Sequence, residues 1–163
     1  MSKKNSNAIL KDGFKNYKEF SEIYLKLEKK LKSLKKKTFL IAVSGGPDSL
    51  ALAALAKAYS YKNKCKIYYV LVDHKIRNNS SHEANLVKKL LKKNHIALNV
   101  LKNKKLIKKN IQSKAREVRY NLLEDFCKKK NIKIILTAHN LEDQVETFFS
   151  DYQEVVVCKA CHL

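Results

Sequence analysis

Four short runs of almost continuously apolar residues recur along the chain, and helix-like segments separate them. The runs are residues 38–43, 67–72, 96–101 and 132–137. A strand that is apolar throughout is buried on both faces, and a helix between two strands allows them to run parallel. The pattern therefore predicts an α/β fold, a parallel sheet with helices on both faces. We expect the third and fourth strands to form its edges.

Three segments between these runs, and one after the last run, have the apolar spacing of helices. They are residues 49–60, the segment from residue 80, residues 111 to about 130, and residues 141–149. Ser49 and Asn140 are candidate N-caps, and Ser80 with Glu83 fits a capping box. The side chains expected to face inward are Leu86, Val87, Leu90 and Leu91 in the second helix and Ile111, Ala115, Val118, Leu122 and Phe126 in the third.

A basic segment, residues 1–37, precedes the first strand. Its apolar residues recur at 17, 20, 24, 27, 31 and 34, which is the spacing of one helix face. The rest of that helix is mostly lysine and glutamate. We expect an amphipathic helix that packs against the domain formed by residues 38–149.

The turn between the first strand and the first helix is Ser44-Gly45-Gly46-Pro47-Asp48-Ser49. A glycine turn that opens a helix directs backbone N–H groups and a positive helix end toward a bound anion. The two glycines let the backbone take positive φ and approach a phosphate closely, and both serines add hydroxyl donors. A carboxylate beside phosphates needs a cation between them, so Asp48 implies Mg²⁺ if a nucleotide binds.

Polar clusters directly follow three of the predicted strands. They are residues 44–49, Asp73-His74 and residues 139–143, which include His139 and Asp143. Right-handed crossovers bring the carboxyl ends of parallel strands to one edge, where ligands bind in such folds. We therefore expect these clusters to form one site.

Arginine is rare in this lysine-rich chain and occurs only at positions 77, 116 and 119. Arg116 and Arg119 are three residues apart and would be neighbours on a helix. Because the guanidinium fork matches phosphate oxygens, we favour phosphate or RNA contacts for all three arginines.

Length and composition fit one globular domain of 163 residues with 45% apolar residues. The formal net charge of +20 permits RNA binding without proving it. No apolar run approaches a membrane span, and no secretory signal begins the chain. Its four cysteines are expected to be free thiols of a cytoplasmic protein.

Four motifs in order carry a specific resemblance. They are S-G-G-P-D-S, L-V-D-H-K-I-R-N-N-S-S-H-E-A, N-I-Q-S-K-A-R-E-V-R-Y-N-L-L and A-H-N-L-E-D-Q-V-E-T. The first resembles the pyrophosphate loop of ATPases that cleave ATP between its α and β phosphates. Together, from about residue 38 to 149, they resemble the N-terminal domain of the tRNA(Ile)-lysidine synthase family.

The resemblance implies a Rossmann-like fold of the adenine nucleotide alpha-hydrolase type. It implies a ligase that uses ATP and Mg²⁺ to adenylate the wobble cytidine of tRNA(Ile), after which L-lysine displaces AMP to form lysidine. Residues 44–49 would hold the departing pyrophosphate, with Asp48 positioning the metal. Asp73 would contribute to nucleotide binding. The catalytic residues implied are Asp48, Arg116, His139 and Asp143.

The chain departs from the family pattern in two places. Asn140 and Glu142 stand where the family has a histidine and an aspartate. Residues 150–163 resemble no part of the family, so we expect a C-terminally truncated chain without the tRNA-binding domains. Cys158-x-x-Cys161-His162 hints weakly at metal or haem attachment. Two alternatives stay open: a tRNA thiolation enzyme of the same superfamily, and an inactive remnant that binds nucleotide or RNA.

Overall fold

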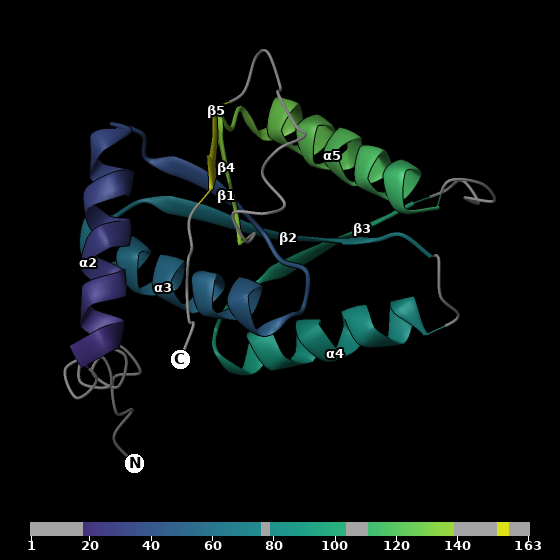
Figure 1. The fold of residues 1–163 in the computed structure, drawn as a ribbon, viewed down its shortest axis with the longest axis horizontal. Coiled ribbons are helices and arrows are strands. Elements are labelled where there is room, and N and C mark those ends of the chain that lie inside the picture. The colour runs from purple at the N-terminus through teal and green to yellow at the C-terminus, as the bar shows by residue number, and fades with distance from the viewer. Residues whose placement is uncertain (1–17, 76–78, 104–110, 139–152, 157–163) are drawn as a thin grey trace.

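The computed structural model describes residues 18–75, 79–103, 111–138 and 153–156 of the chain. A sheet of five strands forms its centre (Figure 1). The strands are β1 (Thr38–Ala42), β2 (Lys66–Asp73), β3 (Leu98–Lys102), β4 (Ile134–Thr137) and β5 (Gln153–Val156). The helices are α2 (Lys18–Ser33), α3 (Pro47–Asn63), α4 (Ser80–Lys93) and α5 (Ile111–Lys130).

The strand order is β3-β2-β1-β4-β5, and every neighbouring pair is parallel. The predicted α/β fold with a parallel sheet is therefore confirmed. The prediction that the fourth strand would form an edge is wrong, because β5 pairs with β4 from Ile134↔Gln153 to Thr137↔Val156. The order of successive strands reverses between β1 and β4, which is where open α/β sheets bind ligands.

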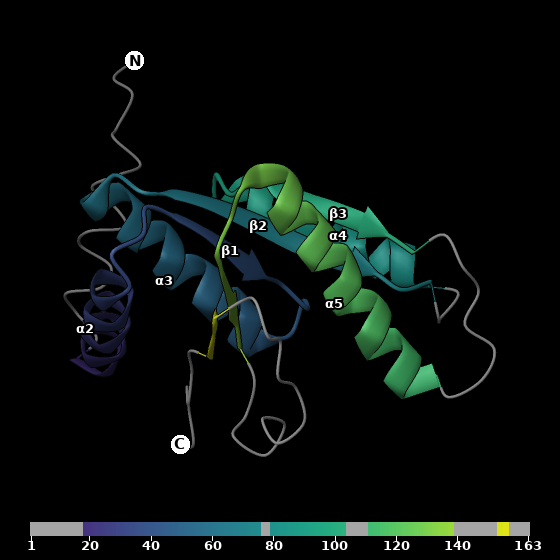
Figure 2. The same cartoon turned by 90° about the horizontal axis from the view of Figure 1, so that it is seen from above.

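Helices cover both faces of the sheet (Figures 1 and 2). Alternate residues of β1 point to opposite faces: Phe39 and Ile41 join the core beneath α3 and α4, whereas Leu40 and Ala42 join the core beneath α5. Each of these four side chains is at most 2% exposed. The continuous apolar run in the sequence thus reflects burial on both sides.

Three side chains predicted to be inward are exposed instead: Leu86 and Leu90 on α4, and Ile111 on α5. The helix α4 contacts the core through Ala84, Val87 and Leu91, a stripe narrower than its apolar residues suggested. The helix α5 buries Tyr120, Leu123 and Cys127 in its C-terminal half. Ile111, the first residue of α5, lies outside that contact and lines a cavity described below.

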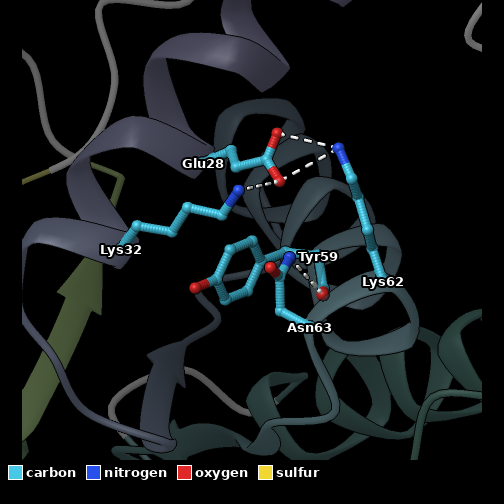
Figure 3. A network of polar contacts seen from close by, with 5 residues as sticks. All are labelled: Glu28, Lys32, Tyr59, Lys62 and Asn63. Atoms are coloured by element: carbon cyan, nitrogen blue, oxygen red, sulfur yellow. Dashed lines mark hydrogen bonds and ion pairs between the residues drawn. The ribbon is translucent and has the colours of Figure 1, made fainter.

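The helix α2 packs beside α3 through Leu27 and Leu31, both at most 1% exposed. Next to them Glu28 is only 5% exposed and forms ion pairs with two lysines (Figure 3). Lys32 lies 3.1 Å from Glu28 Oε1, and Lys62 of α3 lies 3.1 Å from each carboxylate oxygen. The Glu28–Lys62 pair therefore joins α2 to α3.

The four helices that precede β1 to β4 end alike. Each is followed by a residue in the left-handed conformation: Lys35, Lys64, His95 and Asn131, with φ between 47° and 57°. At α4 and α5 the next residue donates back into the helix, Ile96 N–H to Leu91 and Ile132 N–H to Cys127, both at 2.9 Å. No helix in the described part of the chain combines the length and the hydropathy that crossing a membrane would need.

Candidate active site

The turn after β1 depends on one unusual backbone conformation. Gly45 has φ +94°, and a Cβ added there would lie 3.0 Å from Val87 Cγ2 of α4. Only glycine fits such a position without strain. Gly46 does not use this freedom, because its φ is −72°, which any L-residue could adopt.

Gly46 is the N-cap of α3, and Pro47 occupies the first helical turn. Proline is favoured there because its missing N–H would have no partner in any case. The prediction that Ser49 would cap this helix is therefore wrong by one turn.

Ser49 holds the turn together from inside the helix. Its buried Oγ accepts hydrogen bonds from the N–H groups of Ser44 (3.2 Å) and Gly45 (3.1 Å) and donates one to the carbonyl oxygen of Gly46 (2.9 Å). The hydroxyl is thus engaged by the loop itself. Its role in this structure is to fix the loop conformation around the helix start.

The first turn of α3 presents backbone N–H groups and one exposed carboxylate, that of Asp48. The first N–H groups of a helix have no intrahelical partner, and the first to donate back here is that of Leu50, to Gly46. Asp48 lies exposed in this turn. The helix start therefore offers backbone N–H groups for an anion, beside a solvent-facing carboxylate suited to a cation.

Asp73, at the end of β2, is 3% exposed and ties the following segment to the sheet. Its Oδ1 accepts hydrogen bonds from Ser80 Oγ (2.8 Å) and the Lys75 N–H (3.0 Å), and its Oδ2 accepts one from Ser81 Oγ (2.6 Å). Burial alone would raise the pKa of this carboxyl, but these hydrogen bonds and the Lys75 charge bring it below its ordinary value. Asp73 thereby anchors the start of α4.

The predicted capping box is consequently absent. Asn79 occupies the N-cap position of α4 and makes no side-chain cap hydrogen bond. Ser80 is the first helical residue, and its hydroxyl serves Asp73 instead. The Ser80 hydroxyl donates to the buried Asp73 instead of capping the helix, and this long-range bond cannot be predicted from residue spacing.

A cavity of about 610 Å³ lies against these elements at the carboxyl edge of the sheet. Its polar lining comes from the loop, the end of β2 and the starts of α4 and α5, and its apolar lining from β2, α4 and α5. The polar residues are Ser44, Asp73, His74, Ser80, Glu83 and Gln112, and the apolar ones include Leu71, Val72, Leu86, Val87, Ile111 and Ala115. The cavity thus offers hydrogen-bonding groups and apolar surface to the same ligand.

His74, which the sequence placed at the expected site without a specific role, also lines this cavity. Its Nδ1 is buried and has no hydrogen-bond partner among the residues that the structure describes. Burial and the Arg119 charge lower the pKa of His74, and the negative charge of Asp73 offsets only part of this. The imidazole is therefore neutral at physiological pH and can accept or donate a hydrogen bond. Its position after a strand end was the signal available in the sequence.

Two of the three arginines are on α5, whose first turns line the cavity. Arg116 follows the lining residue Ala115 and is half-buried, with its guanidinium carbon 5.5 Å from the centre of the Tyr120 ring. Arg119 is close enough for its charge to act on His74. The helix thus brings positive charge to the same side of the site.

The remaining predicted site residues lie outside the described residues. These are His139, Asp143, Arg77, Asn140 and Glu142, together with the helix expected over 141–149 and the cysteines at 158 and 161. Ala138, which precedes His139, packs against the core that contains the end of β1. Of the predicted residues that are described, Ser44 to Ser49 and Asp73 gather at one edge.

The described part of the chain has neither a cluster of metal ligands nor a cysteine at the carboxyl edge of the sheet. It contains no group of three or more histidine, cysteine, aspartate or glutamate side chains placed to hold a metal ion. The donor set fits Mg²⁺ in one way, because this ion commonly takes one carboxylate together with substrate phosphates and water. Asp48 is an exposed carboxylate at the start of α3. Cys127 is fully buried, which raises its pKa to about 11, and Cys65 precedes β2 at the opposite edge.

Several known proteins with similar sequences share one name. Relatives named tRNA(Ile)-lysidine synthase are 41% identical over 112 residues in Orientia tsutsugamushi, 43% over 113 residues in Wolbachia pipientis and 39% over 119 residues in Bartonella henselae. The matches cover 67%, 66% and 71% of this chain. The chain spans about a quarter of the length of these relatives, 25%, 26% and 24%.

A solved structure supports the fold. The U34-tRNA thiolase NcsA from Methanococcus maripaludis, with its 4Fe-4S cluster, matches with a TM-score of 0.62 and 21% identity. The match covers 76% of this chain and 46% of that one. The family model described as the PP-loop domain matches residues 19–154. With the glycine turn, the helix start and the parallel sheet in place, the chain belongs to the PP-loop domain family.

Proposed function

We propose that this chain binds ATP with Mg²⁺ and carries the adenylation site of a tRNA(Ile)-lysidine synthase. ATP would adenylate the wobble cytidine of tRNA(Ile) and release pyrophosphate, and L-lysine would then displace AMP to give lysidine. The names of the relatives that match two thirds of the chain support this choice of substrate. A cytoplasmic location fits that substrate.

One observation carries the proposal: the start of α3 and the apolar cavity meet at the turn that contains Gly45. A triphosphate on the N–H groups of the α3 start would leave a purine ring within reach of Val72, Val87 and Ala115. Backbone donors fixed before the reaction stabilise the charge that builds up on departing phosphates. The bonds from Ser49 keep the turn in this conformation.

Asp48 is proposed as the metal-binding carboxylate. Mg²⁺ between Asp48 and the phosphates would neutralise charge on the pyrophosphate as it leaves. Arg116 would bind phosphate oxygens from α5, while His139 and Asp143 would orient the reacting groups. What this domain adds is alignment of the cytidine with the α-phosphate, a proximity effect.

The thiolation alternative receives less support from the described cysteines. The likeness to the thiolase concerns the fold alone at 21% identity. Cys127 is packed in the core under α5 and Cys65 stands before β2, so neither lies at the carboxyl edge of the sheet. The remnant hypothesis shares the nucleotide site and differs only in turnover.

The test is AMP release by the full chain, with tRNA(Ile) transcript, ATP and Mg²⁺, in the presence and absence of lysine. Release that requires both tRNA and lysine supports the ligase. Saturable ATP binding without AMP release supports the remnant instead. AMP release that depends on a sulfur donor rather than lysine would identify a thiolation enzyme.

A further inference from the structure

The edge of the sheet opposite the candidate active site has an unusual charge pattern. Four segments of six residues there run from the end of a helix toward the next strand, and we call them links. They are residues 32–37, 61–66, 92–97 and 128–133. They contain four, three, two and four lysines, thirteen in 24 residues, and no aspartate or glutamate. With 32 lysines in 163 residues, the composition alone would place about five there. We name this surface the lysine edge.

The topology brings these links together. The strands that follow them are β1, β2, β3 and β4, which are parallel neighbours in the order β3-β2-β1-β4. Adjacent strands are about 4.8 Å apart, so four strand starts span roughly 14 Å. That is close to the distance over which salt screens charges, about 10 Å at 0.1 M. The lysines of adjacent links therefore repel one another unless an anion lies across them.

Helix ends explain only part of this pattern. Lysines in the last turn of a helix are favoured by its dipole, yet six of the thirteen lie beyond the helix ends. These are Lys35, Lys36, Lys37, Lys64, Lys66 and Lys133. All thirteen are exposed.

Neutralisation within the chain is limited as well. Lys32 and Lys62 pair with Glu28, and Lys128 pairs with Glu124 at 2.7 Å. Within the residues that the structure describes, the other ten lysines form no ion pair with a carboxylate. The edge thus presents a field of positive charge that the fold itself does not compensate.

We propose that the lysine edge binds the phosphate backbone of RNA, on the side of the sheet away from the adenylation site. An aromatic side chain favours RNA over an anionic membrane. Tyr61, within the second link, is 43% exposed, and Lys57 Nζ lies 4.6 Å from its ring centre. Aromatic rings beside cations stack on unpaired bases.

A membrane surface fits less well. Helices that enter a bilayer interface present several large apolar side chains. In the described part of the chain, the four links contain one exposed large apolar side chain, Tyr61. This inference depends on the proposed function only for the choice of tRNA as the probe.

The test compares two charge-reversal pairs in the full chain. Lys36→Glu with Lys129→Glu alters the lysine edge, and Lys88→Glu with Lys89→Glu on α4 changes net charge equally elsewhere; all four lysines are exposed. Fluorescence anisotropy would measure binding of labelled tRNA at several salt concentrations. The edge pair should weaken binding about tenfold and reduce the salt slope by about 1.5, since each phosphate contact contributes about 0.7–0.9. The control pair should change affinity less than twofold.

Equal losses in both pairs, or no loss in either, would overturn the proposal. So would an edge pair that loses binding to phosphatidylserine vesicles while tRNA binding is unchanged, which would assign the edge to a membrane. Unfolding curves check that both pairs fold, and Lys→Gln changes at the same positions replace any pair that does not. ATP binding measured on the same samples should be unchanged, so failure here is distinguishable from failure of the adenylation site.

Discussion

The Ser49 hydroxyl lies 3.1 Å from the backbone nitrogen of Gly45 and accepts its hydrogen bond from within the first turn of α3. The same oxygen accepts the Ser44 N–H and donates to Gly46. One buried hydroxyl therefore fixes the part of the chain on which the nucleotide proposal depends.

Replacing Ser49 with alanine removes all three contacts. Because two N–H groups then lose their acceptor in a half-buried place, we expect the free energy of unfolding to fall by about 1–3 kcal/mol. Urea unfolding monitored by circular dichroism measures this. Ser60→Ala, in the same helix, is the matched control, since its hydroxyl only donates to the Lys57 carbonyl oxygen; equal losses in both variants would contradict the account.

The two loop glycines should respond differently to alanine. At Gly45 the φ of +94° and the 3.0 Å approach of Val87 Cγ2 both oppose a Cβ. We expect Gly45→Ala to lose more than about 1 kcal/mol. At Gly46, with φ −72° and the nearest atom 3.7 Å away, alanine should change stability by less than about 0.5 kcal/mol. Thermal unfolding of the two variants measures this difference, and an equal loss of stability in both would contradict the left-handed conformation of Gly45.

Asp73 makes stability depend on acid pH. Its folded pKa lies below the unfolded value of about 3.9, so its contribution is complete above that value and is lost as the pH falls through the folded pKa. Asp73→Asn should therefore be less stable near pH 6 and show a smaller loss between pH 5 and pH 3. Urea midpoints across this range measure the difference. Asp125→Asn, on the exposed face of α5, should keep the profile of the unmodified chain, and the same profile in Asp73→Asn would refute this role.

Glu28 offers a test of how firmly α2 is attached. Its side chain is 7% exposed, while Lys32 and Lys62 remain 57% exposed. Glu28→Gln should lower the free energy of unfolding by about 2 kcal/mol, less than for a fully buried pair because the lysines are partly hydrated. Chemical unfolding provides the value. Glu124→Gln breaks the more exposed pair with Lys128 and should lose about 0.5 kcal/mol; a larger effect there than at Glu28 would argue against the pair as a joint between helices.

Much of the fold follows from the sequence because its strands are buried on both faces. Runs such as 67–72 fit strands buried on both faces, and the helices between them allow parallel pairing. The edge that holds the site follows from chain connectivity, because right-handed crossovers bring the carboxyl ends of parallel strands together. The strand order β3-β2-β1-β4-β5 does not follow from the sequence pattern. What escaped prediction depended on tertiary partners. Leu90 is exposed because α4 lies on the core through a narrow stripe, and β5 was missed because nothing in its four residues marks it as a partner of β4.

In the candidate site, too, some features could be predicted from the sequence and others depend on tertiary partners. The loop, its position after β1 and the presence of Asp73 at the same edge could be predicted from residue types and strand ends. The roles of Ser49 and Ser80 could not, because local spacing suggested helix caps. Both hydroxyls instead serve partners set by the fold, the loop N–H groups and the buried Asp73. His74 was expected at this edge because it follows a strand end, but its buried Nδ1 and the cavity around it are apparent only in the structure.

Calorimetric titration of ATP tests most directly whether the turn ending at Ser49 holds a triphosphate with Mg²⁺. We predict saturable binding that Asp48→Ala weakens at least about tenfold when Mg²⁺ is present and little when it is chelated. Asp125→Ala serves as the control for loss of one exposed carboxylate. Equal ATP affinity in the Asp48→Ala variant and the unmodified chain, with Mg²⁺ present, would contradict the assignment.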